Sequence, residues 1–103
     1  MINITVRFQE SGDFISLNCL GHANSGPYGQ DLVCAAVSGV VLGGINALKG
    51  KNFTLKDDEI KGEIELKNIG KMSEHDNIVI ETIISQLQSL ARDNPKFIKV
   101  SVI

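Results

Sequence analysis

The sequence predicts an α+β domain in which a mixed, mostly antiparallel sheet carries two helices, in the order ββαββαβ. Five short segments alternate apolar and polar residues, as half-buried strands do. Two longer segments separate them: a nearly continuous apolar run at residues 31–49 and an amphipathic stripe at residues 80–91. A chain of 103 residues can bury one core but not two, so we expect a single domain.

The first two strands are predicted to form a hairpin. Residues 2–8 alternate apolar and polar side chains, and the turn "ESGD" follows. The second strand then has Ile15, Leu17 and Cys19 on its predicted inward face. This period of two is typical of a strand with one buried face. His22 therefore falls just beyond the end of the second strand.

Residues 31–49 are predicted to form the first helix, which begins at residue 31 or 32 and stops at Gly50. The segment is apolar on every side, so we expect a central, covered helix. Gly39 and Gly43 have the spacing that lets another backbone approach closely. The run is shorter than the roughly 20 residues that a bilayer span needs, and we expect no membrane segment.

The second half of the chain predicts a hairpin, a helix and a final strand. Apolar residues on either side of "DDEIKG" indicate strands around residues 53–55 and 64–66. Ser73, with Asp76 three residues later, resembles a capping box at a helix start. An apolar stripe and the stop "DNP" complete this helix, and residues 98–102 alternate as a last strand. The stripe consists of Ile80, Ile83, Ile84, Leu87, Leu90 and Ala91.

Composition excludes some classes of function. The net charge of −2 and the lack of clustered lysine and arginine argue against direct nucleic-acid binding. Two cysteines permit one disulfide, but a chain with 43% hydrophobic residues needs no such staple. The start "MINITVRF" has no charged-then-apolar export signal, so we expect a reducing cytoplasm.

The stretch "GHANSGPYGQDLVCAAVSG", residues 21–39, places a histidine at a strand end and a cysteine in the first turn of a helix. The unpaired N–H groups of a first turn stabilise a thiolate, which is the nucleophilic form of cysteine. The imidazole of His22 can take the proton of the Cys34 thiol and return it to a leaving amine. The same N–H groups can hold the oxyanion of an acyl-transfer intermediate. The pattern therefore predicts nucleophilic catalysis by Cys34.

Each of these residues also has a purely structural interpretation. Cys34 in "VCAAV" fits a tightly packed helix start, and Cys19 fits a buried strand residue. Asp31 either caps the helix or orients His22 as the third member of a triad, and these roles compete for one carboxylate. Ser38, one turn after Cys34, either forms a hydrogen bond near the site or provides a small packing surface.

The loop at residues 24–30 is predicted to be mobile and to close over a peptide substrate. Gly26 and Gly29 allow close approach of a substrate backbone and can act as hinges. The loop offers few buried contacts of its own, which favours motion.

Other chemistries are less compatible with the sequence. The glycine-containing loop leads to an acidic residue without the lysine of a phosphate-binding loop. A zinc site would need Cys19, His22, Cys34 and His75 together, at a spacing that matches no common module. A redox role for Cys34 remains open, although no second cysteine lies at Cys-x-x-Cys spacing. We therefore expect neither a metal nor a cofactor.

At "GHA", the following loop and "GQDLVCAAVS", the sequence resembles the ribosomal-processing cysteine protease family, called Prp. The resemblance extends along the chain to "NAL" at residues 46–48 and to "NPKFIKV" near the end. It implies that His22 is the general base, Cys34 the nucleophile, and Asp31 and Ser38 supporting residues of the same motif.

The resemblance also implies a substrate and an assembly. Members are dimeric cytoplasmic endopeptidases that remove a short N-terminal extension from a large-subunit ribosomal protein, number twenty-seven, during ribosome assembly. The alternative is a non-enzymatic ribosome-assembly or adaptor domain that pairs its sheet edge with a partner strand. Enhanced reactivity of the Cys34 thiol distinguishes the protease from the adaptor.

Overall fold

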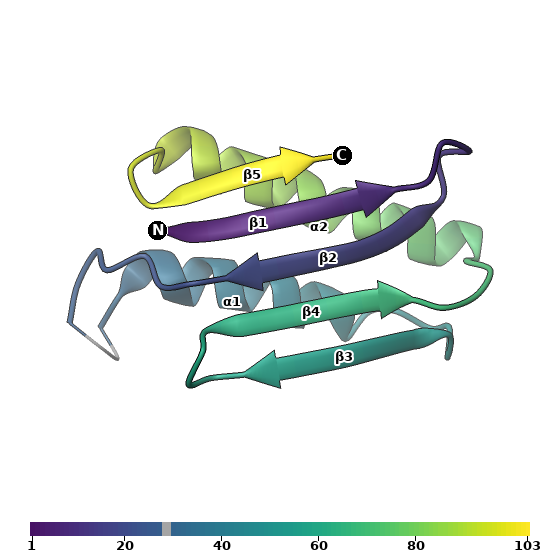
Figure 1. Ribbon diagram of the computed structural model, residues 1–103, viewed down its shortest axis with the longest axis horizontal. Helices are drawn as coiled ribbons and strands as arrows, with labels where there is room; N and C mark the ends of the chain where they lie inside the picture. The colour runs from purple at the N-terminus through teal and green to yellow at the C-terminus, as the bar shows by residue number, and fades with distance from the viewer. Residues whose placement is uncertain (28–29) are drawn as a thin grey trace.

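The computed structural model describes residues 1–27 and 30–103, which form a five-stranded mixed sheet with both helices on one face (Figure 1). The strands lie in the order β3-β4-β2-β1-β5; β1 and β5 are parallel, and the other neighbouring pairs are antiparallel. The predicted α+β class and the order ββαββαβ are confirmed. The elements are β1 (Ile2–Phe8), β2 (Phe14–Leu20), α1 (Leu32–Ile45), β3 (Phe53–Asp58), β4 (Glu63–Asn68), α2 (Glu74–Asp93) and β5 (Ile98–Val102).

The hairpin of β1 and β2 supplies the centre of the core, and one predicted inward residue is wrong. Leu17 and Cys19 are buried as expected, but the inward position near the turn belongs to Phe14, which is 2% exposed. The pairing shifts between Arg7 and Phe8, so that Ile15 is the extra residue of a bulge. A bulge reverses the inside and outside positions of the residues beyond it, which strict alternation does not reveal.

Helix α1 is neither central nor covered on all sides, contrary to the sequence-based expectation. Val37 and Val41 are its fully buried residues, whereas Leu32 at its start is 82% exposed. Both helices lie in one layer on the same face of the sheet, so the side of α1 that points away from the sheet is exposed in the described part of the chain (Figure 1). The helix also ends at Ile45 rather than at Gly50. The N–H groups of Ala47 and Leu48 bond carbonyl oxygens three residues back, and those of Lys49 and Gly50 bond the Asp76 carboxylate. Neither helix in residues 1–27 and 30–103 could cross a membrane.

The close helix contact occurs at a glycine that the sequence did not single out. A Cβ on Gly39 or on Gly43 would meet nothing within 4 Å. A Cβ on Gly44 would instead overlap the side chain of Ile83 on α2. Gly44 therefore allows the two helices to pack closely, whereas Gly39 and Gly43 lie on the exposed side of α1 and take no part in that contact.

Helix α2 begins as predicted and adds a buried carboxylate. The Ser73 hydroxyl accepts from the Asp76 N–H at 3.1 Å, as a cap should. Asp76 is 1% exposed, and its carboxylate accepts from the N–H groups of Lys49 at 2.9 Å and Gly50 at 2.8 Å. These hydrogen bonds hold the pKa of the Asp76 carboxyl below its ordinary value. Asp76 thus ties the segment after α1 to the start of α2.

The substitution Asp76→Asn is expected to lower the free energy of unfolding by about 1–3 kcal/mol at neutral pH, because one buried N–H group then faces an amide donor. A lowered carboxyl pKa stabilises the fold above the ordinary value of 3.8, and this stabilisation is lost as the pH falls through the lowered pKa. Urea unfolding at pH 7 and near pH 3 should show the difference between the two proteins shrinking in acid. Glu81→Gln, on the exposed side of α2, is the matched control. Equal losses in both variants would contradict the role of Asp76.

Candidate active site

His22 lies just past the end of β2, as predicted, and its backbone is held from two sides. The backbone nitrogen of Met1 donates to the carbonyl oxygen of His22 at 2.8 Å. The N–H of Gly21 donates to the carbonyl oxygen of Gly62 at 3.0 Å. His22 is therefore fixed between the beginning of β1 and the turn that joins β3 to β4.

Cys34 lies in the first turn of α1, also as predicted, and is a half-buried free thiol. The N–H of Ala23 donates to its Sγ at 3.2 Å. Ala23 directly follows His22 in the chain and is 3% exposed. This hydrogen bond brings the end of β2 and the start of α1 together at the sulfur, and such a donor stabilises a thiolate.

Asp31 caps α1, and no hydrogen bond joins its carboxylate to the imidazole of His22 among the described residues. Its Oδ1 accepts from the N–H groups of Val33 and Cys34, both at 3.0 Å. Its carboxylate also accepts from the hydroxyl and the N–H of Ser25. The Ser25 hydroxyl, with backbone donors, holds the pKa of the Asp31 carboxyl well below its ordinary value. Of the two competing roles, the structure has the cap, which joins the loop at Ser25 to the helix.

In this structure two of the N–H groups expected to hold an oxyanion at the start of α1 are occupied. The Val33 and Cys34 N–H groups that would hold an oxyanion already donate to Asp31. A short acidic side chain at the cap position competes for these same donors, because capping satisfies the unpaired groups of the first turn.

Two cavities meet at the predicted catalytic residues. One has a volume of about 320 Å³ and extends toward β3 and β4, and the other has about 430 Å³ and extends toward the loop at Gly26. His22, Cys34 and Ser38 line both of them. A peptide that occupied both cavities would pass directly over the thiol.

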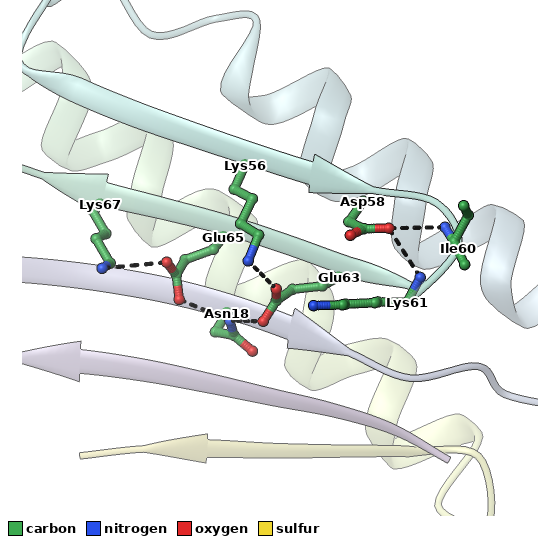
Figure 2. A network of polar contacts seen from close by, with 8 residues as sticks. All are labelled: Asn18, Lys56, Asp58, Ile60, Lys61, Glu63, Glu65 and Lys67. Carbon is green, nitrogen blue, oxygen red and sulfur yellow. Dashed lines mark hydrogen bonds and ion pairs between the residues drawn. The ribbon is translucent and has the colours of Figure 1, made fainter.

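The wall formed by β3 and β4 is acidic. Asp57, Asp58, Glu59 and Glu63 line the smaller cavity. Lys56 pairs with Glu63 at 3.0 Å on the open face of the sheet and holds the pKa of the Glu63 carboxyl below its ordinary value (Figure 2). The site thus has one side formed by β3, β4 and their turn, where acidic residues gather, and one side formed by a loop.

The remaining candidates lie as follows. Cys19 is in the core, where burial raises the pKa of its thiol to about 12, so its structural interpretation is confirmed. His75 bonds the Ala47 carbonyl oxygen at 3.0 Å. Within residues 1–27 and 30–103, no three histidine, cysteine or acidic side chains could hold a metal ion. Gly26 lines the larger cavity, whereas Gly29 lies outside the described residues.

Sequence reasoning missed Ala23, Gly62 and the acidic wall. Ala23 acts through its N–H group, and no side-chain pattern signals that. The acidic wall could have been suspected from "KDDE" next to a predicted turn. Its proximity to Cys34 depends on strand order, because β4 pairs with β2 and so brings the turn to His22.

Known proteins that are similar to this chain are cysteine proteases, in agreement with the arrangement of His22 and Cys34. The family model of cysteine protease Prp matches residues 1–99. The ribosomal processing cysteine protease Prp of Mycoplasma pneumoniae is 30% identical over 100 residues, which cover 95% of this chain and 91% of that protein. The protein of the same name from Staphylococcus aureus is 25% identical over 98% of each chain.

A solved structure gives the same fold. The crystal structure of an essential ribosomal processing protease Prp from S. aureus, in complex with a covalently linked product peptide, matches with a TM-score of 0.92. The match covers 100% of each chain at 24% identity. The match of the family model along nearly the whole sequence favours the protease over the adaptor alternative. The chain is a cysteine protease and belongs to the Prp family.

Proposed function

We propose that this protease removes a short N-terminal extension from a large-subunit ribosomal protein, number twenty-seven, in the cytoplasm during ribosome assembly, with Cys34 as nucleophile and His22 as general base and acid. The observation that carries the proposal is the shared wall of the two cavities, where His22, Cys34 and Ser38 lie together. The names of the relatives support a ribosomal substrate. The net charge of −2 favours recognition of the protein rather than of nucleic acid.

The first half of the reaction forms an acyl-enzyme. His22 accepts the thiol proton, and Sγ of Cys34 attacks the carbonyl carbon of the scissile peptide bond. When the C–N bond breaks, the imidazolium returns its proton to the leaving amine, and a thioester remains on Cys34. The Ala23 N–H, 3.2 Å from Sγ, stabilises the negative sulfur before the attack.

The second half releases the extension. His22 takes a proton from a water molecule, whose oxygen attacks the thioester carbon. The C–S bond breaks, the acid product leaves, and the proton returns to the Cys34 sulfur. Asp31 supports both halves by holding the start of α1, and Ser38 contributes a hydroxyl to the wall along which the peptide lies.

The substrate is tested by incubating the purified protease with the N-terminally extended ribosomal protein from the same cell. Intact-mass measurement of the products should reveal one cut that releases a short N-terminal peptide. The already processed ribosomal protein is the control and should remain intact. An uncut extended protein, under conditions in which the protease cleaves other peptides, would contradict the proposed substrate.

We further propose that the protease is a homodimer that uses the outer side of α1. Leu32, Gly39 and Gly43 are exposed there, and an added Cβ at either glycine would meet open space. The two glycines, four residues apart, permit close packing against a second helix, and Leu32 adds exposed apolar surface beside them. Gly43→Glu should shift the mass measured by light scattering from two chains to one, whereas Gly12→Glu in the β1–β2 turn should leave it unchanged. A wild-type protein that stays monomeric at micromolar concentration would contradict the dimer.

The loop of residues 24–27 is proposed to move when a peptide binds. A Cβ on Gly26 would lie 3.1 Å from the Gln30 carbonyl oxygen, so Gly26→Ala should disturb the wall of the larger cavity. We expect turnover to fall several-fold more than the change in melting temperature would suggest, because the loop adds little to the core. Amide exchange at residues 24–26 should be faster than in α1. Normal turnover, or exchange as slow as in α1, would favour a preformed cleft.

A further inference from the structure

The turn between β3 and β4 reaches the histidine and has a fixed shape. The Asp58 carboxylate accepts from the N–H groups of Ile60 and Lys61, both at 3.1 Å (Figure 2). The turn then passes through Gly62, whose φ of +63° is a conformation that favours glycine. The carbonyl oxygen of Gly62 accepts from the Gly21 N–H at 3.0 Å. The turn is thus tied to the residue immediately before His22.

Gly62 lies directly against the imidazole. A Cβ at this position would be 2.8 Å from both Cε1 and Nε2 of His22, and 3.0 Å from the Gly21 carbonyl oxygen. Real Cβ contacts of 2.8 Å essentially do not occur, so any larger residue at position 62 must displace its neighbour. Two features therefore favour glycine at position 62: the imidazole occupies the space of a Cβ, and the backbone has a positive φ.

The neighbour that must move is the ring and not the backbone. Gly21 has a φ of +105°, and a Cβ on it would lie 2.5 Å from the Met1 carbonyl oxygen, so the chain is already packed against β1. The Met1 nitrogen also holds the His22 carbonyl oxygen. The backbone on both sides of the contact is thus restrained, while the imidazole can rotate about its side-chain bonds.

We propose that Gly62 is a positioning residue for His22, and that its lack of a side chain keeps the imidazole beside the Cys34 thiol. This rests on the proposed role of His22 as general base and acid. Proton transfer needs hydrogen-bond reach, so a small displacement of the ring lowers the rate. Gly62 lines the smaller cavity but touches neither the sulfur nor the scissile bond in this scheme, and it acts on the proton transfer through the imidazole.

The test compares Gly62→Ala with Gly12→Ala. Gly12 has a φ of +92° and open space around its Cα, so the second variant carries a similar backbone strain without touching the site. Gly62→Ala should lower kcat at least about tenfold with KM little changed, while Gly12→Ala keeps the wild-type kcat. Gly62→Asn separates strain from contact, because asparagine tolerates a positive φ but carries a Cβ. It should be as slow as Gly62→Ala.

A second readout does not depend on cleavage. The imidazole NMR signals of His22, measured in Cys34→Ala protein, should shift when Gly62→Ala is added, while those of His75 should not. Unshifted His22 signals, a kcat equal to that of Gly12→Ala, or restored activity in Gly62→Asn would each overturn the positioning role. A fully active His22→Ala variant would instead refute the proposed function, even if the NMR signals still showed that Gly62 positions the ring.

Discussion

Cys34→Ala is expected to abolish peptide cleavage, with a loss of at least about 10⁴-fold in kcat, and to leave the fold intact. The thiol is half-buried at the edge of both cavities, and its sulfur accepts the Ala23 N–H, so its removal leaves little buried space unfilled. Steady-state cleavage of a peptide spanning the processing site, together with a melting curve, measures both quantities.

Cys19→Ser is the matched control for this loss. Cys19 is 4% exposed among aliphatic side chains, and a hydroxyl there costs about 1–3 kcal/mol when it is not hydrogen-bonded. We expect this variant to be less stable and still active wherever it is folded. Similar inactivation by both substitutions, in variants shown to be folded, would contradict the assignment of Cys34 as the nucleophile.

His22→Ala is expected to slow cleavage by about 10²–10⁴-fold, the contribution typical of a general acid–base residue. Raising the pH ionises the thiol without a base, but it supplies no proton to the leaving amine. Activity should therefore recover only in part at high pH. A pH series of kcat/KM for wild type and variant measures this.

His75→Ala is the control for the histidine, because His75 bonds the Ala47 carbonyl oxygen outside both cavities. It should cleave at the wild-type rate. Complete recovery of His22→Ala at high pH would mean that His22 only promotes ionisation of the thiol and does not protonate the leaving group.

The fold was predictable where the periodicity of the sequence is strict. The alternation in residues 2–8 and the stripe on α2 both predicted the buried faces that the structure has. The burial of α1 was not predictable, because a helix that is apolar on every side does not reveal which side faces the sheet. Ile15 was misplaced for a similar reason, since a bulge changes which residues point inward without changing the composition.

The location of the candidate site was predictable where its residues are close together in the chain. His22, Asp31, Cys34 and Ser38 lie within one short segment, and the structure places them around the two cavities. The sequence left two alternatives for Asp31, and in the structure its carboxylate is the cap of α1. The position of Gly62 against His22 depends on the pairing of β4 with β2. A single sequence does not specify which strands become neighbours.

The acyl-enzyme provides the most direct test of Cys34 as the nucleophile. Protease mixed with the extended ribosomal protein, quenched in acid within the first turnover and digested, is analysed by mass spectrometry. The peptide that contains Cys34 should carry the N-terminal extension as a thioester, with a mass increased by that of the extension less one water. The adduct should be absent from Cys34→Ala and should be lost on treatment with hydroxylamine. An adduct on any other residue, or unimpaired cleavage by Cys34→Ala, would contradict the mechanism.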